Sequence, residues 1–192
     1  MILKCRLLLF VALIIWGCGD ADNSPENGAQ LASAAAPVDK NAPPYIIEWP
    51  AGWDITHPPP MGAEGIQVER IRATRWNDEE PAAVIELVYI PLGPSTSLKL
   101  DDEFDAMLST LIEPYRAGGM TTKVEEMAGS LAGLPARQAQ LTSSGSGVVV
   151  SQWVAMAISD RGMYSLFFAG PESEFNRYWG EFQKLLGSLE LH

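Results

Sequence analysis

Residues 148–159 read VVVSQWVAMAIS, and this stretch decides the fold. Successive side chains of a β-strand point to opposite faces, so the stretch divides into two sets of residues. Both sets are apolar: one face carries Val148, Val150, Val154, Met156 and Ile158, and the other carries Val149, Trp153, Ala155 and Ala157. A strand that is apolar on both faces needs cover on both faces. The stretch therefore predicts a strand inside a sheet that has further layers above and below it.

Two amphipathic helices are predicted that can supply these layers. The first follows Asp101-Asp102-Glu103, whose charges suit the amino end of a helix, and it ends at Gly118-Gly119. The second begins at Pro171, a residue suited to the first helical position. In both helices apolar residues recur at spacings of three and four, which forms one stripe. The stripes are Phe104, Met107, Leu108, Leu111, Ile112 and Tyr115 in the first, and Phe175, Tyr178, Trp179, Phe182, Leu185, Leu186 and Leu189 in the second.

Six further segments have the composition and flanking turn residues of strands. They are Tyr45–Trp49, Gly65–Trp76, Ala82–Ile90, Thr121–Ala128, Leu134–Thr142 and Met163–Ala169. Turn-forming residues at 143–147 and 160–162 separate the last strands, which predicts a meander. The sequence therefore predicts one α+β domain over residues 45–192. Its fold class is an antiparallel β-sheet flanked by helices, an α/β/α sandwich.

This order of elements, with three short motifs, resembles the PsbP-like (DcrB-like) α/β/α sandwich superfamily. The motifs are Pro50-Ala51-Gly52-Trp53, Gly133-Leu134-Pro135-Ala136, and Met163-Tyr164-Ser165-Leu166 ahead of the last helix. The superfamily includes a photosystem extrinsic subunit, a nuclear-import factor that binds a small GTPase, secretion-effector chaperones and envelope lipoproteins. Its members share a fold and protein binding but no reaction. The resemblance therefore implies a PsbP-like sandwich that binds a protein partner.

The first 17 residues have the pattern of an export signal. Lys4 and Arg6 precede an apolar run from Leu7 to Trp16. The run ends in Ile15-Trp16-Gly17-Cys18, which resembles the lipobox of bacterial lipoproteins, although Trp16 stands where a small residue is usual. The resemblance implies a signal peptide over residues 1–17 and lipidation of Cys18, with cleavage before this cysteine. Lipid on Cys18 would anchor the protein to a membrane of the cell envelope, on the periplasmic side of the inner or outer membrane in a Gram-negative cell.

Other interpretations of the leader remain open. Ordinary signal peptidase could cleave after Ala34-Ala35-Ala36, although this site lies far from the apolar run. The leader could also stay uncleaved, but ten apolar residues are short for a membrane span, and Cys18 could be an ordinary thiol. Residues 19–44 are rich in Asp, Asn, Ser, Pro, Gly and Ala, with little to bury, which predicts a flexible tether.

Charge limits the class of partner. The chain has 13 basic and 24 acidic residues, and removal of the leader with Lys4 and Arg6 leaves 11 basic residues and a net charge of about −13. Such a surface disfavours nucleic acid, so we expect a protein partner in the envelope.

No catalytic motif accompanies the histidines. His57 lies in a proline-rich loop, Thr56-His57-Pro58-Pro59-Pro60, and His192 ends the chain, where residues usually fray. The nucleophile elbow, the zinc-protease helix motif and the phosphate-binding loop are absent from the sequence. We therefore expect neither enzymatic activity nor a metal or other cofactor.

Four residues are candidates for contact with a partner. Trp53 and His57 lie in the stiff loop, and Arg70 and Arg72 share one face of a predicted strand. Each has a structural alternative, because Trp53 could plug the end of the sandwich and the arginines could pair with Glu69 or Glu86. The sequence predicts a non-catalytic binding or accessory protein. The alternatives are a carrier or sensor of a small apolar ligand and, less favoured, a hydrolase that uses His57.

Overall fold

A computed structural model of the chain describes residues 44–59, 68–93 and 96–192. The predicted leader, Cys18 and the tether up to residue 43 lie outside these ranges. The elements are β1 Tyr45–Ile46, β2 Asp54–Thr56, β3 Glu69–Asn77, β4 Glu80–Pro91, α1 Leu100–Ala117, β5 Thr121–Leu131, β6 Leu134–Gly145, β7 Val148–Ile158, β8 Gly162–Pro171, α2 Glu172–Ser188 and β9 Glu190–Leu191.

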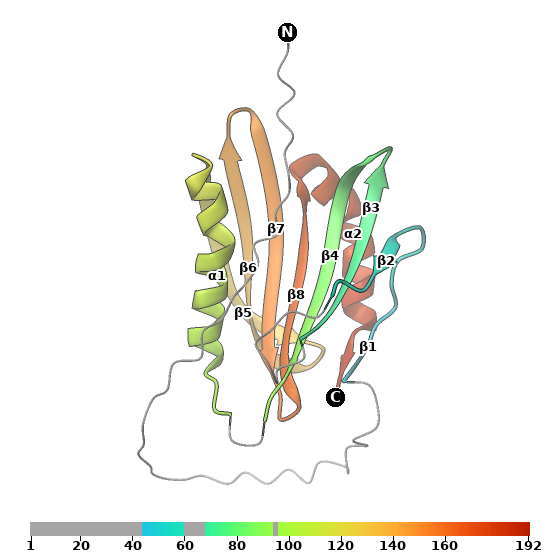
Figure 1. The fold of residues 1–192 in the computed structure, drawn as a ribbon, viewed down its shortest axis with the longest axis vertical. Coiled ribbons are helices and arrows are strands. Elements are labelled where there is room, and N and C mark those ends of the chain that lie inside the picture. Colours follow the sequence, from blue (N-terminus) through green and yellow to red (C-terminus); the bar gives the residue numbers. More distant parts are fainter. Residues whose placement is uncertain (1–43, 60–67, 94–95) are drawn as a thin grey trace.

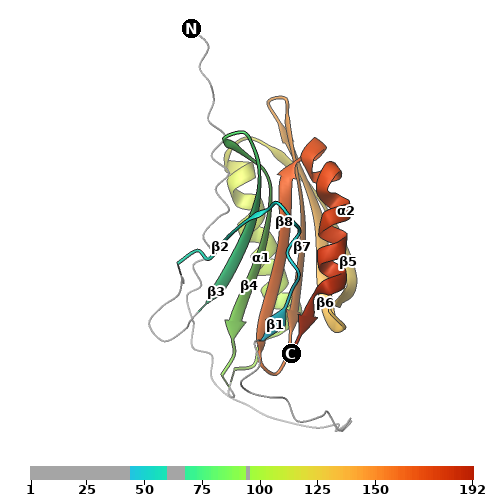
Figure 2. The ribbon, with the colours of Figure 1, turned by 90° about the vertical axis from the view of Figure 1, so that its right-hand side faces the viewer.

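The main sheet is antiparallel and has the order β2-β3-β4-β8-β7-β6-β5. Strands β5 to β8 form the predicted meander. Helix α1 lies over β5, β6 and β7, whereas α2 lies over β4, β8 and β7 on the opposite face (Figures 1 and 2). The described residues thus form a single α+β domain, as the sequence predicts.

Strand β7 is covered on both faces, which confirms the prediction from residues 148–159. Trp153, Ala155 and Ala157 belong to the apolar cluster under α2. Val154 and Met156 belong to a second cluster with Phe104 and the other buried residues of α1. One strand therefore joins two separate cores, and each core depends on a different helix.

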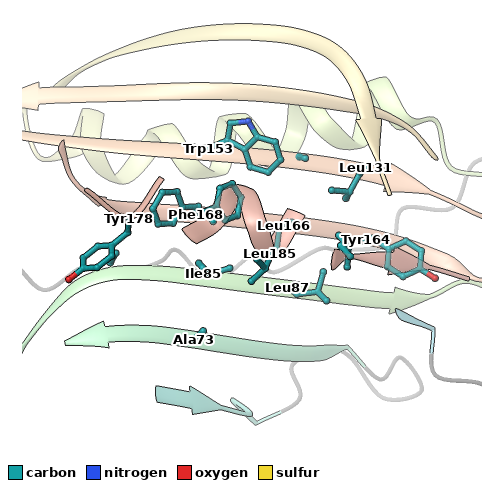
Figure 3. Close-up of a cluster of buried hydrophobic side chains, with 14 of the residues drawn as sticks. Ala73, Ile85, Leu87, Leu131, Trp153, Tyr164, Leu166, Phe168, Tyr178 and Leu185 are labelled. Carbon is teal, nitrogen blue, oxygen red and sulfur yellow. The ribbon is translucent and has the colours of Figure 1, made fainter. Parts of the chain in front are cut away.

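Stacked aromatic rings fill the core under α2. Phe168 of β8 lies between Phe175 and Phe182, with ring centroids 4.7 Å apart in both pairs. Trp153 meets the edge of Phe182 at 5.1 Å. Figure 3 shows Trp153 and Phe168 side by side, with Tyr178 and Leu185 at the same layer of the core.

The structure differs from the predicted elements mainly at the ends of strands. The first strand stops at Ile46 rather than Trp49, because the Glu48 amide donates to Ser188 Oγ instead of to a neighbouring strand. Pro171 is the residue before α2 and not its first helical residue. The turn predicted at 143–147 contains only Ser146 and Gly147, both at positive φ, since β6 runs on to Gly145. Of the segment predicted from Gly65, residues 65–67 lie outside the described ranges.

Two short strands were not predicted. β2 pairs with the outer side of β3, and β9 pairs with β1 in a separate two-stranded sheet. The pairing of Tyr45 with Leu191 brings the first and last described residues together (Figure 1). His192 does not fray: its amide donates to Pro44 O at 3.0 Å, and its own oxygen lies 3.0 Å from Tyr164 Oη. We call these contacts of β1, β9, Pro44 and His192 the terminal clasp.

The stacked core makes Phe182 the most sensitive position of α2. Its ring is fully buried and contacts Phe168, Trp153 and Trp179. We expect Phe182→Ala to lower the free energy of unfolding by about 3–5 kcal/mol, because truncation leaves a cavity among rings that cannot collapse into it. Denaturant unfolding followed by circular dichroism measures this change. Trp76→Ala is the control, with an expected loss below about 1 kcal/mol, because Trp76 is exposed. Equal losses in the two variants would contradict the assignment of the core.

Candidate functional site

The two helices are offset, and part of the sheet therefore has no helix over it. Since α1 lies over β5, β6 and β7, the same face of β2, β3 and β4 has no helix above it in the described part of the chain (Figure 1). The register assigns residues to this face: Glu86 of β4 lies opposite Phe167 of β8, which packs into the core under α1. We call the residues on this side of β2, β3 and β4 the open face. They are Asp54, Thr56, Arg70, Arg72, Thr74, Trp76, Val84, Glu86 and Val88.

Glu86 holds two arginines at the centre of the open face. Arg70 Nε donates to Glu86 Oε1 at 2.7 Å, and Arg72 Nε donates to Glu86 Oε2 at 2.8 Å. Only 4% of the Glu86 side chain is exposed, whereas Arg72 is 31% exposed. Each carboxylate oxygen therefore binds one guanidinium, and the three residues together carry one positive charge. The sequence suggested cross-strand ion pairs as the structural alternative for these arginines. The pairs with Glu86 are present, and they hold both arginines in fixed positions.

Trp76 is the large exposed aromatic of the open face. Its side chain is 49% exposed, and its Nε1 lies 3.4 Å from Asp54 Oδ2. A shift of register between Arg75 and Trp76 precedes it, next to the β3–β4 turn. Trp76 is not among the four residues that the sequence suggested for contact with a partner. The signal that could have found it is its place at the end of a strand beside the acidic turn Asp78-Glu79-Glu80.

Trp53 is buried, which supports the structural alternative for this residue, a plug at the end of the sandwich, and not contact with a partner. Only 7% of it is exposed, and its indole N–H donates to Glu181 Oε2 of α2 at 2.7 Å. Its ring meets the edge of Tyr178 at 5.6 Å. Gly52, at φ +80°, turns the chain toward this contact, and its carbonyl accepts a hydrogen bond from Arg75. The Pro50–Trp53 turn packs the Trp53 side chain under α2, where it closes the end of the sandwich. It is therefore no longer a candidate for contact with a partner.

His57 is exposed directly after β2. Its neighbour Thr56 is the register partner of Arg72, so β2 brings the histidine to the edge of the open face. The loop beyond residue 59 lies outside the described ranges. The described residues contain no group of three His, Cys, Asp or Glu side chains arranged to hold a metal ion. Arg70, Arg72 and Trp76 thus lie on one face of the sheet, and His57 lies beside its edge.

The terminal clasp lies at the other end of β3. Tyr45 Oη lies 3.4 Å from Glu69 Oε2, and burial together with the Glu69 charge raises the pKa of Tyr45 to about 12. Tyr164 Oη lies 3.0 Å from both Pro44 O and His192 O, and burial raises the pKa of this hydroxyl as well. Both phenols therefore stay protonated at neutral pH. The residues that precede Pro44 consequently join the domain at the clasp end.

Two hollows of the described surface lie outside the layers where the helices pack on the sheet. One, of about 330 Å³, is lined by polar side chains of β5 and β6: Thr121, Lys123, Glu125, Gln140, Thr142 and Ser144. The other, of about 530 Å³, lies along the outer side of α1 and is lined by Ser109, Thr110, Glu113, Pro114 and Ala117. Neither lies between the sheet and a helix, so neither favours the alternative of a ligand carrier. None of the helices in the described ranges is both long and apolar enough to cross a membrane.

The arginine pair depends on the buried Glu86 carboxylate. We expect Glu86→Gln to lower the free energy of unfolding by about 2–4 kcal/mol, because it removes the buried carboxylate charge that both guanidinium groups share. Urea unfolding measures the change. Glu113→Gln is the control: it removes an exposed i,i+3 partner of Arg116, and its expected effect is below about 1 kcal/mol. A Glu86 variant as stable as the Glu113 variant would contradict this account.

Comparisons with known proteins agree with the geometry. The profile of the family described as Domain of unknown function (DUF4946) matches residues 44–191. Among curated proteins no sequence matches. The solution structure of cyanobacterial PsbP (CyanoP) from Synechocystis sp. PCC 6803 is similar with a TM-score of 0.54 at 11% identity, over 78% of this chain and 87% of that chain. At this identity the likeness shows the fold alone. The domain thus has a PsbP-like α+β fold, and the chain belongs to the DUF4946 family.

Proposed function

We propose that this chain is a lipid-anchored protein of the bacterial cell envelope whose domain binds another envelope protein through the open face. The role is non-catalytic, as an accessory or binding module. The observation that carries the proposal is Trp76, half exposed on a sheet face that also presents Arg72 fixed by the buried Glu86. Tryptophan and arginine are the residues most enriched at the energetic centres of protein interfaces.

The rigidity of the open face supports binding. An arginine that is already held by a carboxylate loses less conformational entropy when a partner docks on it. Arg70 and Arg72 are each held by the same carboxylate of the adjacent strand, and the backbone under them is a paired β-strand. His57 at the edge of β2 adds a polar group at the rim. A polar rim around an aromatic anchor is the usual anatomy of such interfaces.

The position of Trp76 suits a domain that is anchored from its clasp end. Trp76 lies seven residues along β3 from Glu69, the residue next to Tyr45. At about 3.3 Å per residue this separates them by about 23 Å. A tether that joins at Pro44 would therefore leave the tryptophan on the far part of the domain, away from the membrane.

The anchoring part of the proposal rests on the first 18 residues. The basic and apolar leader ending in Ile15-Trp16-Gly17-Cys18 resembles a lipoprotein signal, and DcrB-like envelope lipoproteins are among the proteins that the domain motifs resemble. The acidic mature chain disfavours nucleic acid as a partner. Cell-envelope localisation, on the periplasmic side in a Gram-negative cell, follows from the same leader.

The anchor can be tested by metabolic labelling with a palmitate analogue. We expect label on the wild-type chain and none on Cys18→Ala, because only the thiol of Cys18 would receive the diacylglyceryl group. Cys5→Ala is the matched control, since this cysteine lies within the predicted signal peptide, and it should keep the label. Label that persists in Cys18→Ala would refute lipidation at this residue.

The binding surface can be tested by crosslinking and capture from membranes that contain the full chain. We expect Trp76→Ala to fold normally and to lose about 30-fold or more in affinity for its partner, as a central interface tryptophan does. Ile55→Ala is the matched control: Ile55 is 41% exposed on β2, but it lies on the opposite face, level with the buried Ala73. Loss of the partner in Ile55→Ala with retention in Trp76→Ala would place the site on the other face.

A further inference from the structure

Strand β5 forms one edge of the main sheet. Within the described ranges it pairs only with β6, and the pairing runs from Thr121 to Leu131 without a shift of register. Its outer side thus presents the backbone N–H and C=O groups of alternate residues along an 11-residue strand. Long regular edges bind other strands readily unless a bulge, a proline, a covering element or unmatched charged side chains prevent it. The sequence of β5 contains no proline.

Neither helix covers this edge. α1 contacts β5, β6 and β7, so it packs on one face of these three strands rather than beside the outer edge of β5. α2 lies on the other face, over β8 and its neighbours. Met127 of β5 is 42% exposed, which leaves an apolar side chain beside the unpaired backbone.

We propose that β5 pairs antiparallel with β5 of a second copy of the chain, so that the two sheets become continuous. The charges on the strand select the partner and the register. In an antiparallel pair with two-fold symmetry, opposite residues share a face and one residue lies opposite itself. Centring the pair on Lys123, Glu125 or Glu126 would oppose like charges. Centring it on Val124 places Lys123 opposite Glu125 of the second copy, twice.

This register is the one symmetric arrangement that opposes a lysine to a glutamate. In the single chain Lys123 and Glu125 form an ion pair along the strand. In the dimer each lysine would pair with Glu125 of the second copy instead, so every one of these charges would keep an opposite charge beside it. Glu126 lies on the other face with Arg137, and its partner in the second copy would be the neutral Thr122. Met127 would lie opposite Thr121, which covers its exposed side chain.

The helices leave room for such a pair. Three strand spacings of about 4.8 Å separate β6 of one copy from β6 of the other, about 14 Å in all. An α-helix with its side chains is about 10–12 Å across, so two α1 helices above the two β6 strands fit side by side. The inference does not depend on the open face, which lies at the opposite edge of the sheet.

Cysteine crosslinking of the full chain in membranes tests the register. Directly opposed Cα atoms across an antiparallel pair lie about 4.5–5.5 Å apart, within the range of Cα distances that a disulfide spans. We expect Val124→Cys to form a disulfide-linked dimer under mild oxidation. Ala128→Cys, on the same strand and the same face, would lie about 26 Å from its counterpart in this register and should give no more dimer than the wild-type chain.

Charge reversal tests the choice of partner. Lys123→Glu opposes two pairs of glutamates, and we expect it to weaken dimerisation about tenfold or more, measured by sedimentation of the full chain in detergent. The double variant Lys123→Glu with Glu125→Lys restores both pairs and should restore the dimer. Equal crosslinking at residues 124 and 128, a disulfide to a chain of another mass, or no rescue by the double variant would each overturn the proposal. A variant that no longer dimerises but still captures its partner through the open face would show that the two proposals fail or hold independently.

Discussion

The structure depends on one constraint, the apolar character of both faces of β7. A strand of this kind cannot lie at a surface, so it needs neighbours on both sides and a layer on each face. Val154 and Met156 pack with α1, and Trp153 and Ala155 pack with α2. Because β7 is the strand that both helices share, the helices overlap there and diverge on either side. The open face and the uncovered side of β5 and β6 are consequences of this offset.

Much of the fold was predictable because it follows from local pattern. The two helices, the meander and the faces of β7 come from side-chain periodicity, which a single segment contains in full. The short strands β2 and β9 were missed because a segment of two or three residues is too short to show a periodic pattern. Their pairing depends on tertiary contacts such as those of Glu48 with Ser188 and of Tyr164 with Pro44.

The candidate site was predictable only in part, for a related reason. Arg70, Arg72 and Glu86 could be grouped because cross-strand neighbours follow from a hairpin register. Whether a tryptophan is buried depends on whether a helix packs over it, and this cannot be predicted from the residues next to it in the sequence. Trp53 meets Glu181 and Tyr178 of α2, which are far from it in the chain, whereas no helix of the described ranges covers Trp76. The sequence around each tryptophan therefore could not decide which of the two is buried.

The terminal clasp has a consequence for the order in which the domain assembles. Strands β5 to β8 pair with their neighbours in sequence, so their contacts are local and form early. β1 pairs with β9, which includes the penultimate residue of the chain, and Tyr164 reaches both Pro44 and His192. The first residues of the domain to leave a ribosome or a translocation channel must therefore wait for the last ones before they acquire their partners. Clasp closure therefore cannot precede the delivery of residues 190–192.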